Sequence, residues 1–91
     1  MKVTLLQQDI VWANPEANVK HIDELLASAE PADLYILPEM FSTGFATSPA
    51  GIAETDGGET INWMIRTAKQ RNCAIAGSVA VEHDGKFYNR F

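Results

Sequence analysis

One glutamate stands out as a residue that could do chemistry. Glu39 follows a short apolar run, residues 33–38, and precedes Met40 and Phe41. An apolar run without alternation is typical of a strand covered on both faces in a parallel sheet. The carboxyl ends of such strands are where α/β sheets place their sites. A carboxylate among apolar neighbours is expected to be partly desolvated, which suits a general base. The alternative is a glutamate that turns to solvent or caps a turn.

Two phenylalanines on the following loop are candidates for a substrate-binding wall. Phe41 and Phe45 flank Gly44, and both lie close to Glu39 in the sequence. An apolar wall excludes water and strengthens the interactions of the charges inside it. Ordinary core packing is an equal alternative for Phe41 and a weaker one for Phe45. Gly44 is expected to adopt a positive φ in this loop.

Two polar residues near Phe91 are possible neighbours of Glu39. Arg90 could pair with the carboxylate, which would give that acid a structural role. Asn89 could orient the site as a buried amide, or it could face water from the last strand. Lys69 and Lys86 are interpreted as surface charges, because one lies near a helix end and the other beside a turn.

Neither the lone cysteine nor the histidine-containing turn indicates a second reactive group. Cys73 begins a strand-like run, and a lone cysteine in an apolar strand is usually an inert core residue. Glu82, His83 and Asp84 are adjacent in a turn and do not have the spacing of metal ligands. The sequence therefore predicts one base, no nucleophile and no metal site within these 91 residues.

The elements that must position Glu39 follow from residue spacing. Residues 2–11 are expected to form a strand. Asn14 and Pro15 predict the N-cap and first position of a helix that ends before Pro31. Its buried stripe, which must lie on a sheet, is predicted to comprise Asn18, Ile22, Leu25, Leu26 and Ala29. With the strand at 33–38, this gives a right-handed βαβ unit.

The second half of the chain repeats this arrangement. Residues 40–57 are interpreted as a loop, and a second helix is expected to open at residues 57–60 and to close at Asn72. Its predicted buried stripe is Ile61, Met64, Ile65 and Ala68. Residues 73–81 are predicted to form one strand, followed by a hairpin turn at Asp84-Gly85 that leads into residues 86–91.

The expected fold class is therefore α/β, with the order β-α-β-α-β-β. Two right-handed crossovers place both helices on one face of the sheet. The apolar strands then need a cover on their other face. We expect the 91 residues to be the front part of a larger fold, or to pair with another chain.

Composition limits the size, the partners and the compartment of this chain. With 91 residues it forms at most one domain, and its formal net charge of -5 comes with one cysteine. Nucleic-acid and anionic-membrane partners are not expected, because phosphate contacts need clustered Lys and Arg and no such cluster occurs. The first apolar stretch, residues 3–6, is too short for a signal peptide or a membrane span. A reducing cytoplasm is the default expectation.

Several segments together carry a family resemblance. Residues 36–45 resemble the segment with the catalytic glutamate in the nitrilase, or carbon-nitrogen hydrolase, superfamily. Residues 6–12, with Asn18 after them, resemble its first strand and first helix, and residues 76–78 and 88–91 resemble its third and fourth strands. Residues 38–41, with Gly44-Phe45 and Asn62-Trp63, look most like the omega-amidase branch. The resemblance implies that residues 1–91 are the amino-terminal portion of a single α-β-β-α sandwich domain, incomplete in this chain.

The resemblance also implies an activity. Family members use a Glu, Lys, Cys triad, and Glu39 matches its first member, whereas the segments with the lysine and the cysteine do not occur. The implied reaction is hydrolysis of 2-oxoglutaramate to 2-oxoglutarate and ammonia, without a metal or organic cofactor. Subunits are expected to pair through their helical layers, as a homodimer or higher homo-oligomer. These 91 residues alone are expected to be inactive.

Two other interpretations remain open from the sequence. One is a non-enzymatic βαβ module that binds another protein through the uncovered face of its sheet. The other is a different branch of the same superfamily, such as a carbamoylase or another amidase.

Overall fold

The computed structural model describes residues 1–45, 53–55 and 58–91. The elements follow the order β1 (Val3–Leu5), α1 (Pro15–Ser28), β2 (Leu34–Ile36), α2 (Glu59–Arg71), β3 (Ala74–Ala76), β4 (Val79–His83) and β5 (Lys86–Arg90). Half of the loop expected at residues 40–57, and the first residue of the expected helix opening, lie outside the described residues. The predicted α/β class is confirmed.

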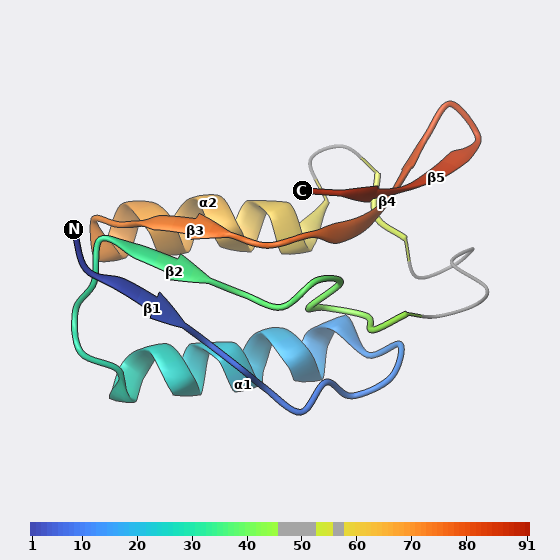
Figure 1. Ribbon diagram of the computed structural model, residues 1–91. Coiled ribbons are helices and arrows are strands. Elements are labelled where there is room, and N and C mark those ends of the chain that lie inside the picture. Colours follow the sequence, from blue (N-terminus) through green and yellow to red (C-terminus); the bar gives the residue numbers. More distant parts are fainter. Residues whose placement is uncertain (46–52, 56–57) are drawn as a thin grey trace.

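A parallel sheet of three strands forms the centre of the fold. The strand order is β1-β2-β3, so β2 lies in the middle. Tyr35 lies opposite Thr4 on one side and Ile75 on the other. Figure 1 shows α1 running along β1 and α2 along β3. The predicted βαβ unit is therefore present twice, and residue 39 lies just beyond the carboxyl end of the central strand.

The first helix begins as its sequence predicts. Asn14 is the N-cap, and its side-chain oxygen accepts a hydrogen bond of 3.1 Å from the backbone N–H of Ala17. Pro15 is the first helical residue, where its missing N–H costs no hydrogen bond. Three members of the predicted stripe are fully buried, namely Asn18, Ile22 and Leu26.

The predicted stripe of the second helix is confirmed in part, because Ile61 and Met64 pack against the core, but the most buried face is rotated from it. Thr60, Trp63 and Thr67 are its buried residues, whereas Ile65 is exposed. The bulky indole of Trp63 explains this rotation, because its Nε1 donates a 2.9 Å hydrogen bond to Asp23 on α1. The helix ends at Asn72, as expected, and Asn72 adopts the left-handed conformation.

The two faces of the sheet differ in burial. The core lies between the sheet and the helices and contains Ile22, Leu26, Tyr35 and Trp63. On the opposite face, Val3 is 46% and Leu5 is 72% exposed. These residues align with Leu34 and Ile36 of β2, which are only partly buried. The described residues therefore leave an apolar sheet face open, as the predicted need for a further cover implies.

The strand predicted over residues 73–81 is interrupted. It divides into β3 and β4 at Gly77 and Ser78, and β4 pairs with β5 in a separate antiparallel sheet. A Cβ atom at position 77 would lie 3.0 Å from Cδ1 of Phe41, so any larger residue would require the ring to shift by a few tenths of an ångström, and glycine permits this close approach. The hairpin turn predicted at Asp84-Gly85 is confirmed, with φ values of 51° and 74°.

The first strand is shorter than the predicted range of 2–11. Regular pairing stops at Leu5, although the Leu6 N–H still donates to the Ile36 carbonyl. Beyond this point the backbone is bound by side chains, because Val11 exchanges hydrogen bonds with the amide of Asn18. These contacts with the helix replace strand pairing.

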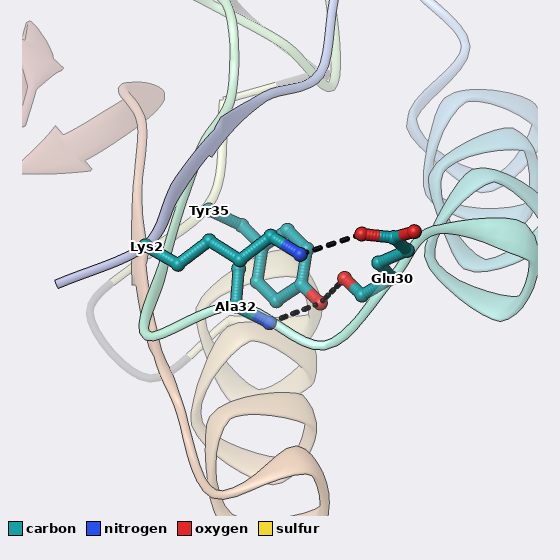
Figure 2. A network of polar contacts seen from close by, with 4 residues as sticks. All are labelled: Lys2, Glu30, Ala32 and Tyr35. Carbon is teal, nitrogen blue, oxygen red and sulfur yellow. Dashed lines mark hydrogen bonds and ion pairs between the residues drawn. The ribbon is translucent and has the colours of Figure 1, made fainter.

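The amino-terminal edge of the sheet is held by a small polar network (Figure 2). The Tyr35 hydroxyl donates to the Glu30 carbonyl at 2.9 Å and accepts from the Ala32 N–H at 3.1 Å. Lys2 Nζ forms an ion pair of 2.6 Å with Glu30. The hydrogen bond and the positive charge of Lys2 lower the pKa of Glu30, which is fully exposed. The Lys2 N–H donates to the side chain of Asp33 at 2.6 Å.

Candidate active site

Glu39 lies at the carboxyl-terminal edge of the sheet, two residues after the last backbone contact of β2 with β3. That contact is the hydrogen bond from the Leu37 N–H to the Ala76 carbonyl, 2.8 Å long. The expectation that apolar neighbours partly desolvate the carboxylate is wrong for the described residues, because Glu39 is exposed. Leu37 and Phe41 direct their side chains into the core and leave the glutamate between them at the surface.

The backbone turn that carries Glu39 is closely fixed. Met40 has a φ of 52°, which is uncommon for a residue with a side chain. Its N–H donates a 2.9 Å hydrogen bond to Oγ of Ser78, and its carbonyl accepts from Gly44 at 2.8 Å and from Thr43 at 3.2 Å. Gly44 has the expected positive φ, 69°. The turn is therefore determined by contacts rather than by the preferences of its own residues.

A buried amide on α1 holds the loop after Glu39. Asn18 is 1% exposed and makes three hydrogen bonds. Its Oδ1 accepts from the Val11 N–H at 2.7 Å, and its Nδ2 donates to the carbonyls of Val11 and Ser42, both at 2.8 Å. Nearby, Nε2 of Gln8 donates to the Phe41 carbonyl at 2.9 Å.

The sequence indicated that Asn18 is buried but not what its amide does. A polar side chain within a buried helical stripe needs hydrogen-bond partners, since an unpaired buried amide is costly. That rule could have identified Asn18 as a structural link to an adjacent loop. Nothing in the sequence identified the loop as residues 41–44.

The carboxylate of Glu39 is bound by a side chain of the β4–β5 hairpin. Nδ2 of Asn89 on β5 donates a 2.7 Å hydrogen bond to Oε2 of Glu39. The two residues line a hollow of about 320 Å³ together with Leu37, Gly77, Ser78 and Phe91. Of the two neighbours considered from the sequence, Asn89 thus contacts the glutamate, and a pairing of Arg90 with Glu39 stays a prediction.

The two predicted wall residues do not line this hollow. Phe41 is 0% exposed and packs in the core, where its ring centroid lies 6.1 Å from that of Trp63. Phe45 is 60% exposed. Neither is among the described residues that line the hollow beside Glu39. The structure gives Phe41 a packing role, and substrate contact by Phe41 or Phe45 stays a prediction.

Cys73 lies at the opposite edge of the sheet from Glu39. It precedes Ala74, which is paired in register with Leu34 at the start of β2. Glu39 follows Leu34 by five residues, so the two side chains are separated by roughly 15 Å at the rise of an extended chain. Proton transfer needs hydrogen-bond distance. Cys73 is partly buried against the core, in agreement with the inert role expected for it.

The described residues show no metal cluster. In the described ranges, no group of three or more His, Cys, Asp or Glu side chains is arranged to hold a metal ion. Neither α1 nor α2 has the length and apolar character required to cross a membrane.

Comparisons with known proteins identify the family of this chain and two of its relatives. A family model described as carbon-nitrogen hydrolase matches residues 2–91. The chain is 43% identical to omega-amidase YafV of Escherichia coli K12, over all of this chain and 35% of that protein. It is 33% identical to 2-oxoglutaramate amidase of Bacillus subtilis, over 96% of this chain and 35% of that protein. The chain thus spans about a third of the length of these relatives.

A solved structure has the same arrangement of elements. XC1258 from Xanthomonas campestris, described as a CN-hydrolase superfamily protein with an arsenic adduct in its active site, superposes with a TM-score of 0.89 at 32% sequence identity. The similarity covers 97% of this chain and 34% of that one.

Proposed function

Since the chain belongs to the carbon-nitrogen hydrolase family, we propose that the complete protein is an amidase and that Glu39 is its general base. The observation that carries this proposal is the place of Glu39. Its carboxylate follows the central parallel strand, lines a hollow and accepts a hydrogen bond from Asn89. Sites in α/β sheets are built at this edge.

The proposed chemistry is nucleophilic amide hydrolysis. Glu39 accepts the proton of a cysteine thiol, and the thiolate attacks the amide carbon to form a tetrahedral oxyanion. A lysine ammonium stabilises that oxyanion. Ammonia leaves with a proton returned by Glu39, and a thioester remains. Water, deprotonated by Glu39, then attacks the thioester, which releases the carboxylic acid and restores the thiol.

The thiol and the ammonium of this scheme are proposed to come from outside residues 1–91. Cys73 is excluded by its distance from Glu39, as described above. Lys69 and Lys86 are exposed residues at a helix end and beside a hairpin turn. The 91 residues are therefore proposed to be inactive alone.

The proposed substrate is a small omega-monoamide, in the first place 2-oxoglutaramate. The names of two relatives support this choice, because one is an omega-amidase and the other a 2-oxoglutaramate amidase. The proposal includes a cytoplasmic location, since that compartment keeps a catalytic thiol reduced. It also includes pairing of identical subunits through their helical layers.

Replacement of the proposed base tests this function in the complete protein. Glu39→Gln is expected to lower kcat for ammonia release from 2-oxoglutaramate by about 10³-fold or more, because the thiol loses its proton acceptor. The change keeps the size of the side chain, and glutamine can still bond to Asn89. The thermal unfolding midpoint is therefore expected to stay the same. Ammonia release and thermal unfolding are the two measurements.

The matched control is Glu30→Gln, which makes the same change at the other edge of the sheet. Glu30 is exposed and pairs with Lys2, so the control is expected to retain full activity. Equal activity in both variants would contradict the assignment of Glu39. Lack of ammonia release by the unmodified complete protein from omega-monoamides would contradict the proposed substrate.

A further inference from the structure

We infer that Asn89 is a positioning residue that holds the carboxylate of Glu39 in its working orientation. The inference rests on the proposed function and deepens it, because it assigns a role to the β4–β5 hairpin. Residues 39 and 89 are 50 positions apart in the sequence, yet their side chains are joined by a 2.7 Å hydrogen bond. The hairpin therefore completes a site whose base is supplied by the sheet.

Asn89 is well placed to act as a fixed reference point. It pairs in register with Ala80 on β4. That strand is anchored in the core, because Val79, Ala80 and Val81 are all buried. Adjacent residues of β4 and β5 are held by regular antiparallel pairing, so the amide of Asn89 projects from a rigid element. Rigid elements position functional groups more accurately than loops do.

Glu39 needs such a partner because its backbone is fixed while its side chain is not. The turn is bound through the Met40 N–H to Ser78 and through the Met40 carbonyl to Gly44. The Glu39 side chain is exposed and has three rotatable bonds, so its carboxylate can otherwise occupy many orientations. The hydrogen bond from Asn89 restricts these orientations at the carboxylate itself.

The chemistry of a carboxamide suits a base that gains and loses a proton in each cycle. An ionised carboxylate only accepts hydrogen bonds, and Nδ2 of Asn89 donates one. When Glu39 is protonated, a rotated amide can accept from the carboxylic acid through Oδ1. Asn89 can therefore orient Glu39 in both protonation states. A lysine or arginine in its place could donate to Glu39 but could not accept a hydrogen bond from its protonated form.

The test uses Asn89→Ala and Asn89→Asp in the complete protein. Asn89→Ala removes the donor and is expected to lower kcat about tenfold or more, with KM changed less than about twofold, because orientation matters in the transition state. Asn89→Gln retains a carboxamide and is expected to recover part of the loss. The thermal unfolding midpoint should stay constant, since position 89 is exposed.

Asn89→Asp tests direct contact with Glu39 through the pH profile of kcat/KM. Glu39 is the one titratable side chain among the described residues that line the hollow. A second carboxylate beside it favours retention of a proton by the pair, so the acid limb should move to higher pH by about one unit. Tyr88→Phe, which removes a polar group from the neighbouring position of β5, is the control and should leave kcat and the pH profile unchanged.

The outcomes separate this inference from the proposed function. If Glu39→Gln abolishes activity while the Asn89 variants match the unmodified protein in kcat and in pH profile, the positioning role is wrong and the proposed function stands. If Glu39→Gln remains active, the proposed function fails and the role of Asn89 fails with it. A loss in Asn89→Ala that comes with a lowered unfolding midpoint would also contradict positioning, because it would indicate a structural role.

Discussion

The two edges of the parallel sheet use similar polar contacts in opposite surroundings. At the amino-terminal edge, Lys2 pairs with Glu30 and bonds to Asp33, and all three residues are exposed. At the carboxyl-terminal edge, Asn18 and Ser78 are buried and bind the loop that carries Glu39. Water can replace the first set of contacts but not the second. The contacts of Asn18 and Ser78, at the edge with the proposed base, are therefore expected to restrict the local geometry more than the ion pair of Lys2 does.

Asn18→Leu removes buried contacts at the carboxyl-terminal edge and is expected to destabilise the protein more than the other variants below. The change leaves the Val11 N–H and the carbonyls of Val11 and Ser42 without the partners that Asn18 supplies. Each lost buried partner costs about 1–3 kcal/mol. We expect the free energy of unfolding of the complete protein to fall by about 3 kcal/mol, measured by denaturant titration.

Asn14→Ala is the matched control on the same helix, one turn earlier. It removes the N-cap bond to Ala17, which is worth about 1 kcal/mol. If the free energy of unfolding falls equally in Asn18→Leu and Asn14→Ala, the buried amide contributes no more to stability than the exposed one. That result would contradict the difference drawn between the two edges.

Ser78→Ala is expected to lower stability less than Asn18→Leu does, but it is also expected to lower activity. The Met40 N–H loses its acceptor, which costs about 1–2 kcal/mol. Because this bond holds the turn after Glu39, kcat of the complete protein is expected to fall about tenfold. Steady-state kinetics and denaturant titration measure the two effects. Ser28→Ala, on the exposed end of α1, should change neither quantity; a loss of activity there, or none in Ser78→Ala, would count against the role of the turn.

Lys2→Met removes the ion pair with Glu30 at the exposed edge. Of the variants proposed here, it is expected to change stability least. Lys2 lowers the pKa of Glu30 in the folded protein. A lowered pKa stabilises the fold above the ordinary pKa of the carboxyl group, and this stabilisation is lost as the pH falls through the folded-state value. Because Glu30 is exposed, we expect Lys2→Met to lower the unfolding midpoint at pH 7 only slightly, and this difference to disappear as the pH falls through the folded-state pKa of Glu30. A large loss at pH 7 would contradict an exposed, weakly contributing edge.

Local patterns predicted much of the fold because their causes lie close in the sequence. The N-cap at Asn14, the left-handed end of α2 at Asn72 and the hairpin turn at Asp84-Gly85 all follow from nearby residues. The predicted helix face of α2 was only partly right, because Ile61 and Met64 pack against the core but Trp63, which bonds to Asp23 on the other helix, sets the rotation of the helix. Tertiary contacts of this kind override the apolar spacing within one helix.

The candidate site was predictable in position but not in its environment. An apolar run followed by Glu39 was enough to place the acid at the end of a parallel strand. The exposure of Glu39 was not predicted, because it depends on Leu37 and Phe41 turning inward, and Phe41 is accommodated by the absence of a Cβ at Gly77. The bond from Asn89 depends on where the β4–β5 hairpin lies, which local sequence does not specify.

The most direct test of the account is the position of the Glu39 carboxylate in a crystal structure of the complete protein. We predict that it accepts a hydrogen bond from Asn89 and lies within hydrogen-bond reach, about 3–4 Å, of the sulfur of the nucleophilic cysteine. A carboxylate directed away from that sulfur into bulk solvent, with Asn89 bound elsewhere, would contradict both the proposed base and the site built around it.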